Sequence, residues 1–308
     1  MARTSAPRRR YAAALGAVLG WGLGLTACTT FTGDPVTRGP SSTTGTAWRR
    51  EAVPTGTAPL VLAAYRDGLL LGAARPPDST AATPSSVGAA DDEIHRAGLA
   101  TAVQPEVYTL QGGRWSALPV QAASGYGAVA TWSALHLSAD GSIVAVGGAR
   151  GGAHANVRWS VWRGDVTSGL REQPQGFTVF GGWGAGDQGG IVEAGGIPLL
   201  FGSWGGRAGL DIAVWRPDGD RWVRQSSEGT DLGSTATRLV SAAGGTGWGP
   251  GAVLVGSVLH LGESLRQTPA LFRSASADGP WTALELPGSA DSAPGSSAGS
   301  PGGAASSG

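Results

Sequence analysis

A short β-type run that ends in glycine recurs along the sequence. It reads LLLG, VAVG, LLFG and VLVG, and it ends at Gly72, Gly147, Gly202 and Gly256. The last three glycines are 55 and 54 residues apart, whereas the first gap is 75 residues. A period in this range is typical of stacked structural units, so the repeat limits the chain to architectures built from such units.

Each unit continues with a second β-type run that carries an aromatic residue: Tyr108, Trp162, Trp215 and Phe272. A turn and a final run follow, with Trp115, Leu170, Trp222 and Trp281 at the matching positions. Another β-type run precedes each glycine-ended run. Four short antiparallel strands per unit form the pattern of a β-propeller blade. We therefore predict an all-β, propeller-like fold with about four four-stranded blades of roughly 55 residues, against the alternative of a β-sandwich.

The units resemble two propeller families at a distance. Their length is similar to that of kelch repeats. The stretch SADGPW, with Ser276, Asp278 and Trp281, resembles a worn form of the Asp-box of sialidase-type propellers, although its Asp lies too close to the Trp. A fifth final-type run surrounds Trp48. The chain is therefore expected to form either a small ring with a spare strand or, as we favour, an open arc with an exposed edge.

The N-terminal residues have the order of a secretory signal. Four arginines within residues 1–10 precede an apolar run from Tyr11 to Ala27, which is short for a membrane span. The run closes on Leu25-Thr26-Ala27-Cys28, which resembles the lipobox of bacterial lipoproteins. The resemblance implies that Cys28 becomes the lipid-modified first residue of an exported protein, held at the outer face of the cytoplasmic membrane.

Composition divides the chain into four parts. We expect a signal peptide over residues 1–27, a flexible tether over 28–47, a propeller-like domain over 48–288 and a disordered tail over 289–308, because both flanking segments are small, polar and rich in Gly and Pro. Cys28 is the single cysteine, so the fold has no intramolecular disulfide.

Charge argues against a nucleic-acid partner. The whole chain is neutral, with 22 basic and 22 acidic residues, but removal of residues 1–27 takes away four arginines and no acid. The remainder has a net charge of −4. A nucleic-acid-binding domain would need a basic patch, so we expect the partners to be the membrane, through the lipid on Cys28, and an envelope protein or glycan.

Enzyme and cofactor motifs give little support to catalysis. The letters G-x-G-x-x-G occur at Gly184–Gly189, but β-type runs follow where a dinucleotide site needs a helix. The cluster DDEIH, residues 91–95, lies in the long insertion of the first unit and fits a solvated loop. We therefore expect no cofactor, no metal and no catalytic residue.

Loops between the second and third strands of each blade should emerge on one face. They and neighbouring glycine-rich loops supply the candidate ligand-binding residues: Arg150, His154, Trp183, Trp204, Arg207, His260 and Arg266. Guanidinium groups suit carboxylates, and exposed tryptophans suit sugars or protein hot spots. Trp248 is expected on the opposite face. Tyr126 lies in a loop next to this set, but no motif pairs it with a glutamate.

The sequence favours a lipid-anchored binding or scaffold protein at the cell envelope, without catalysis. The alternative is a sialidase-like glycoside hydrolase or a sugar-binding lectin that uses the loop-face arginines. A decayed or truncated gene product is a third possibility.

Overall fold

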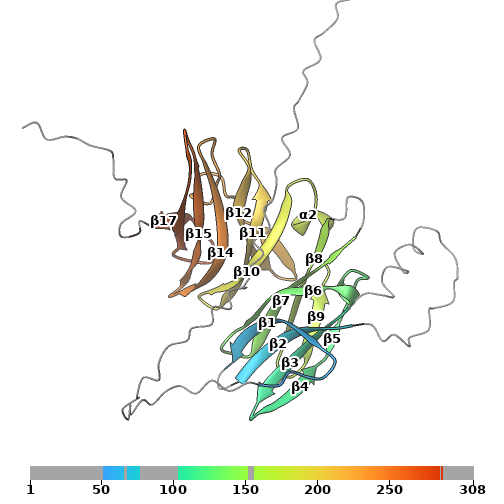
Figure 1. Ribbon diagram of the computed structural model, residues 1–308. Coiled ribbons are helices and arrows are strands. Elements are labelled where there is room, and N and C mark those ends of the chain that lie inside the picture. The colour runs from blue at the N-terminus through green and yellow to red at the C-terminus, as the bar shows by residue number, and fades with distance from the viewer. Residues whose placement is uncertain (1–50, 66–67, 77–102, 152–155, 285, 287–308) are drawn as a thin grey trace, which may run out of the picture. The chain divides into compact units, whose positions relative to one another are not determined.

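The computed structural model describes residues 51–65, 68–76, 103–151, 156–284 and 286. Its strands form four sheets in chain order (Figure 1). The expected boundaries at residues 27, 47 and 288 lie outside the described residues. No helix among the described residues is long and apolar enough to cross a membrane.

Each sheet is an antiparallel meander of four consecutive strands. The first sheet contains β1 (Ala58–Tyr65), β2 (Gly68–Arg75), β3 (Gln104–Gln111) and β4 (Arg114–Leu118). The third contains β10 (Ala185–Ala194), β11 (Ile197–Gly205), β12 (Leu210–Asp218) and β13 (Arg221–Arg224). The fourth contains β14 (Arg238–Trp248), β15 (Gly251–Leu261), β16 (Leu265–Ser274) and β17 (Trp281–Leu284). The predicted quartets of short strands are confirmed.

The second sheet has a strand that the sequence did not predict. Its meander is β6 (Thr131–Leu137), β7 (Ser142–Arg150), β8 (Val157–Asp165) and β9 (Gly169–Gln173). The two-residue β5 (Val120–Gln121) joins its edge in parallel with β9. Two short helical turns, η1 (Gly127–Val129) and α2 (Phe177–Phe180), flank the same sheet.

Apolar cores join consecutive sheets face to face. The aromatic residue of each third strand packs against the sheet before it: Trp162 lies in the core between the first and second sheets, Trp215 between the second and third, and Phe272 between the third and fourth. Among the described residues, none of these cores joins the fourth sheet to the first. The fold is therefore propeller-like, with four blades stacked in chain order.

The repeat glycines lie opposite an irregularity in the first strand of each blade. Gly147, Gly202 and Gly256 pair with residues at register shifts in β6, β10 and β14. A Cβ at Gly202 would press on the carbonyl oxygen of Asp187, and one at Gly256 on that of Ser241. At Gly202 and Gly256 the bulged backbone therefore approaches so closely that only glycine fits, whereas Gly147 has more room.

Gly72 in the first blade also pairs with a residue at a register shift, Val61 of β1, but a Cβ there would meet side chains and not backbone. The nearest atoms to a Cβ there belong to side chains, Val61 Cγ2 at 2.6 Å and Leu135 Cδ1 at 2.7 Å. Leu135 comes from the second sheet, so Gly72 makes room for packing between blades. The first unit thus differs from the others in more than its extra residues.

The outer face of the fourth sheet carries a hydrogen-bonded group of polar side chains beside exposed apolar ones, Val255 and Leu265. The Ser241 and Ser257 hydroxyl oxygens are 2.9 Å apart, and Gln267 Nε2 donates to Ser257 Oγ at 2.8 Å. These residues lie on the face opposite Val240 and Leu254, which pack against the third sheet.

A hydrogen-bonded contact joins the first strands of the second and third blades. His136 Nε2 on β6 lies 3.1 Å from Glu193 Oε2 on β10, and the Ser138 hydroxyl donates to the same carboxylate oxygen. The Ser138 hydrogen bond lowers the pKa of Glu193, with a smaller contribution from His136, although partial burial acts in the opposite direction. The ionised carboxylate therefore stabilises this seam.

Replacing Gly256 with Ala should destabilise the fourth blade strongly. The added methyl group meets backbone atoms that cannot move without breaking the β14–β15 ladder, so we expect a loss of about 3 kcal/mol or more in the free energy of unfolding. Gly244→Ala is the matched control, because its Cβ meets nothing closer than Val255 Cγ2 at 3.4 Å. Equal urea denaturation midpoints for the two variants would contradict the close approach.

Glu193→Gln should weaken the fold in a pH-dependent way. Because the folded-state pKa of Glu193 is lowered, its contribution is present above the pKa of the unfolded chain and is lost as pH falls through the folded-state value. We expect a loss of about 1–2 kcal/mol at pH 7 that shrinks toward pH 2, measured by urea denaturation of both proteins. An equal loss at both pH values would show that the charge on Glu193 has no role.

Candidate functional site

A cleft of about 660 Å³ opens between the second and third sheets. We refer to it as the cleft. The end of β7, the start of β8, the α2 turn, the loop after it and the start of β10 contribute its described lining, which includes Arg150, Arg158, Trp159, Phe177, Trp183 and Asp187. Strand ends and loops of two neighbouring blades thus meet where the blades pack together.

A stacked pair forms one side of the cleft. The guanidinium carbon of Arg158 lies 4.6 Å from the centroid of the Phe177 ring. Phe177 is 58% exposed and begins the α2 turn, while Arg158 lies near the start of β8. Stacking of this kind restricts the long arginine side chain while its N–H groups stay available to a ligand.

Trp159 anchors the cleft to the third sheet. Its side chain packs on the core between the second and third sheets, and its Nε1–H donates to the carbonyl oxygen of Gly186 at 3.2 Å. Because this bond links β8 to β10, it fixes the two strands that carry Arg158 and Asp187 relative to each other.

Trp183 is the most exposed apolar side chain among the described residues, with a relative exposure of 105%. It lies between Gly182, whose φ is +103°, and Gly184. A Cβ at Gly184 would lie 2.5 Å from Trp204 Nε1, so the loop sits directly on the Trp204 ring. The glycines therefore hold the indole of Trp183 outward, in solvent.

The bulge of β10 places a carboxylate at the cleft. The register with β11 shifts twice between Ala185 and Gly190, and the Asp187 N–H donates to Ser203 Oγ at 3.0 Å instead of to a ladder partner. Asp187 is exposed and lines the cleft, whereas the next residue, Gln188, is buried. Bulges commonly redirect side chains in this way.

The structure brings together some of the residues that the sequence singled out. Arg150 and Trp183 line the cleft. Trp204 lies behind it: its ring packs edge-on against Trp215, with the centroids 6.1 Å apart, and under the Arg224 guanidinium at 4.6 Å. Burial lowers the pKa of Arg224. Trp204 thus supports the loop that carries Trp183, and His154 lies outside the described residues.

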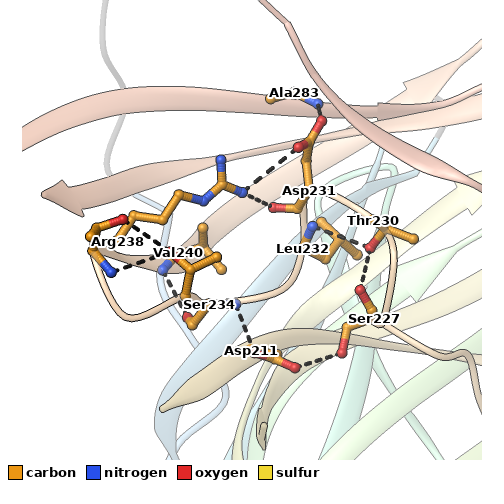
Figure 2. Close-up of polar contacts among 11 residues, drawn as sticks. Asp211, Ser227, Thr230, Asp231, Leu232, Ser234, Arg238, Val240 and Ala283 are labelled. Atoms are coloured by element: carbon orange, nitrogen blue, oxygen red, sulfur yellow. Dashed lines mark hydrogen bonds and ion pairs between the residues drawn. The ribbon is translucent and has the colours of Figure 1, made fainter. Parts of the chain in front are cut away.

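Arg207 lines a separate hollow of about 380 Å³. The hollow borders the segment between the third and fourth sheets, whose polar contacts are drawn in Figure 2. There Asp211 accepts hydrogen bonds from the Ser227 hydroxyl at 2.6 Å and the Ser234 N–H at 2.8 Å. These two hydrogen bonds attach the segment between the third and fourth sheets to the Asp211 carboxylate.

His260 and Arg266 lie together in the fourth sheet, away from the cleft lining. They face each other across β15 and β16, and His260 Nε2 is 3.0 Å from the Thr268 hydroxyl. Trp248 lies at the end of the β14–β15 hairpin, with the Arg273 guanidinium 5.9 Å from its ring. The seven predicted residues therefore occupy at least three places, and their role in binding stays a prediction.

Sequence reasoning missed Arg158, Trp159, Phe177 and Asp187. In the sequence, Arg158 and Trp159 show only the alternation of a β-strand with one polar face. This alternation does not indicate which residues of the neighbouring blade lie next to them. Among the described residues, no group of three or more His, Cys, Asp or Glu side chains is placed to hold a metal ion. The DDEIH cluster lies outside those residues.

The comparisons with known proteins found similarity in structure only. No family model and no curated protein matches the chain. A protein from Bacteroides thetaiotaomicron described as a glycosidase aligns at a TM-score of 0.40 and 12% identity, over 75% of this chain and 71% of its own. An α-L-arabinofuranosidase from Clostridium thermocellum aligns at a TM-score of 0.33 and 12% identity, over 77% and 74%.

These neighbours correct the first expectation about function. The sequence favoured a non-catalytic binding or scaffold protein, whereas the similar structures carry the names of glycoside hydrolases, the class that the sequence gave as the alternative. At 11–13% identity and TM-scores of 0.40 or less, they assign neither a substrate nor a catalytic residue to this chain.

Proposed function

We propose that the chain binds an acidic carbohydrate in the cleft between the second and third sheets. The observation that carries this proposal is the presence of a fully exposed tryptophan, Trp183, in one lining with two arginines, Arg150 and Arg158. An indole ring offers a flat apolar surface for the C–H face of a sugar. A guanidinium group offers paired N–H donors that match a carboxylate.

The charges of the lining favour an acidic sugar over a neutral one. Asp187 is the single carboxylate among the described lining residues, against the two guanidinium groups. Within the described part of the chain, neither Arg150 nor Arg158 has an ion-pair partner. Their donors are therefore free for a carboxylate, while Asp187 can accept hydrogen bonds from sugar hydroxyls.

Binding is common to both forms of the alternative, the lectin and the hydrolase. Hydrolysis by the usual two-carboxylate route needs a proton donor and a second carboxylate on either side of the glycosidic bond. Asp187 supplies one carboxylate at the cleft. Product analysis of the same sugars, by chromatography after incubation with the protein, separates binding from turnover.

Trp183→Ala should weaken binding of an acidic sugar at least tenfold. The change removes the stacking surface without touching the core, and a tenfold loss corresponds to about 1.4 kcal/mol. Isothermal titration with N-acetylneuraminic acid and with D-glucuronic acid measures it, and Arg158→Ala should lower the same affinity.

Trp248→Ala is the matched control for this experiment. Trp248 is also an exposed tryptophan, 58% accessible and near an arginine, but it lies on the fourth sheet outside the cleft lining. Its removal should leave the affinity unchanged. The proposal fails if neither acid binds, or if the Trp183 and Trp248 variants lose affinity equally.

We also propose that the protein is exported and held at the cell envelope by a lipid on Cys28. The proposal rests on the LTAC sequence at the end of an apolar run, as described above. A single acyl chain gives marginal membrane binding, so stable anchoring takes more than one chain. The propeller-like domain would then present its cleft outside the cytoplasmic membrane.

Cys28→Ala should abolish lipid attachment. When the full chain is expressed in a bacterium that processes lipoproteins and fed an alkyne-labelled palmitate, the unchanged chain should carry the label. The Cys28→Ala variant should carry none, because it lacks the one thiol that would carry the lipid. Thr29→Ala, one residue further along, should keep the label. Label on the Cys28 variant would exclude this anchor.

A further inference from the structure

A hollow of about 500 Å³ lies at the edge strand of the second sheet, beside the third sheet. Its described lining comes from β5, the end of β8, β9 and the turn between β12 and β13, and it includes Gln121, Arg163, Arg171 and Asp220. We refer to it as the edge hollow. It shares no described lining residue with the cleft, so it is a separate place on the protein.

Three donor side chains stand in one row at the edge hollow. Arg163 on β8 pairs with Arg171 on β9, and Arg171 pairs in parallel with Gln121 on β5. Paired residues of neighbouring strands have their side chains on the same face of a sheet. Arg163 also pairs with Val144, which lies in the core between the second and third sheets. The row therefore faces the third sheet.

The residues just before the row face the opposite way. Val120 pairs with Leu170, and both pack in the core between the first and second sheets. The Leu170 N–H donates to the carbonyl oxygen of Pro119 at 2.8 Å, which holds β5 at the edge of β9. The two-residue β5 thus brings the Gln121 amide alongside the two guanidinium groups.

The two arginines of the row oppose each other without a counter-charge. Side chains in directly opposed positions have Cβ atoms about 4.5–5.5 Å apart, and like charges there destabilise a sheet. Neither guanidinium, nor the Gln121 amide, has a hydrogen bond or an ion pair with any residue that the structure describes. Arg163 is half-buried, with its guanidinium carbon 5.9 Å from the centroid of the Trp222 ring. The row therefore holds donors and positive charge that lack an acceptor.

Two carboxylates belong to the same lining, and neither neutralises the row. Glu172 pairs with Trp162 on the other face of the sheet, and it accepts hydrogen bonds from the N–H groups of Ala123 and Ser124 at 2.7 and 2.8 Å. Asp220 is exposed, and its carboxylate forms no ion pair within the described ranges. On the face of the row, two guanidinium groups thus stand against one carboxylate.

We propose that the edge hollow binds a tetrahedral oxyanion, a phosphate or sulfate group. A phosphate group carries a charge of about −2 and has three strong acceptor oxygens even as an ester, which suits two guanidinium groups and one amide. A carboxylate has only two oxygens, and a single guanidinium fork can occupy both. This site goes beyond the acidic-sugar site of the cleft and does not depend on it.

Isothermal titration of the full chain with sodium phosphate, sodium sulfate and sodium acetate, at constant ionic strength, tests the proposal. Phosphate or sulfate should bind, and acetate should bind about tenfold more weakly or not at all. Arg163→Gln and Arg171→Gln should each weaken binding of the oxyanion about tenfold, because each removes a charge and a pair of donors. Arg171 is exposed, so its variant should fold even if the half-buried Arg163 proves necessary for stability.

Asp220→Asn should change the affinity in the opposite direction. It removes a negative charge from the lining, so the oxyanion should bind several-fold more tightly. A structural role alone would not produce opposite effects from the arginine and aspartate variants. Weaker binding in Asp220→Asn would place the anion elsewhere and overturn the proposal.

Glucose 6-phosphate separates the two sources of the group. Tighter binding of this ester than of inorganic phosphate would show that the group belongs to a larger ligand. Equal or weaker binding would show that the site takes the free ion. Either result supports the site, provided that the Arg171 variant weakens it.

Two control variants decide whether the binding is local. Arg114→Gln removes an exposed arginine of β4, outside the edge hollow, and Trp183→Ala alters only the cleft. Both should leave the affinity for phosphate and sulfate unchanged. The inference fails if none of the oxyanions binds, or if either control loses as much affinity as Arg171→Gln. Titration with the acidic sugars is a separate measurement, so the proposed function stands or falls independently.

Discussion

The close approach between a bulged first strand and the glycine opposite it sets the geometry of the blades. At Gly202 and Gly256 the bulged backbone occupies the space of a side chain. The extra residue in the strand bends it and changes which side chains face the next blade. In β10 the register shifts twice, which turns Asp187 outward to the cleft while Gln188 stays buried. The candidate site therefore depends on a register shift in a first strand, a feature that recurs in all four blades.

Local patterns were enough to predict the strands and their grouping. Alternating apolar residues and turn glycines are encoded within a few positions, so the four meanders follow from the sequence. β5 was missed because two residues carry no periodicity. The different packing of Gly72 could not be foreseen either, since it depends on Leu135 in another blade. Local patterns also do not show which blades pack together. The cores between consecutive blades, and the lack of a described core between the fourth blade and the first, appear only in the tertiary structure.

The candidate site was predicted only in part, because local sequence patterns reveal only some of its residues. Arg150 and Trp183 stood out because a charged residue at a strand end and a tryptophan among glycines are visible in the sequence. Arg158 and Phe177 became functional candidates only when β8 and the α2 turn were placed at one seam. The expectation of one common loop face gathered residues from several blades, and of these residues Arg150 and Trp183 line the cleft.

The polar group on the outer face of the fourth sheet makes this sheet different from the inner sheets. Ser241, Ser257 and Gln267 bond to one another there, so a further blade stacked on this face would have to bury their hydroxyl and amide groups. A duplication of an inner blade would keep this ending, whereas a duplication of the last blade would enclose it. The second and third sheets bury apolar side chains on both faces, so an inner blade and the last blade could not exchange places in the array without repacking.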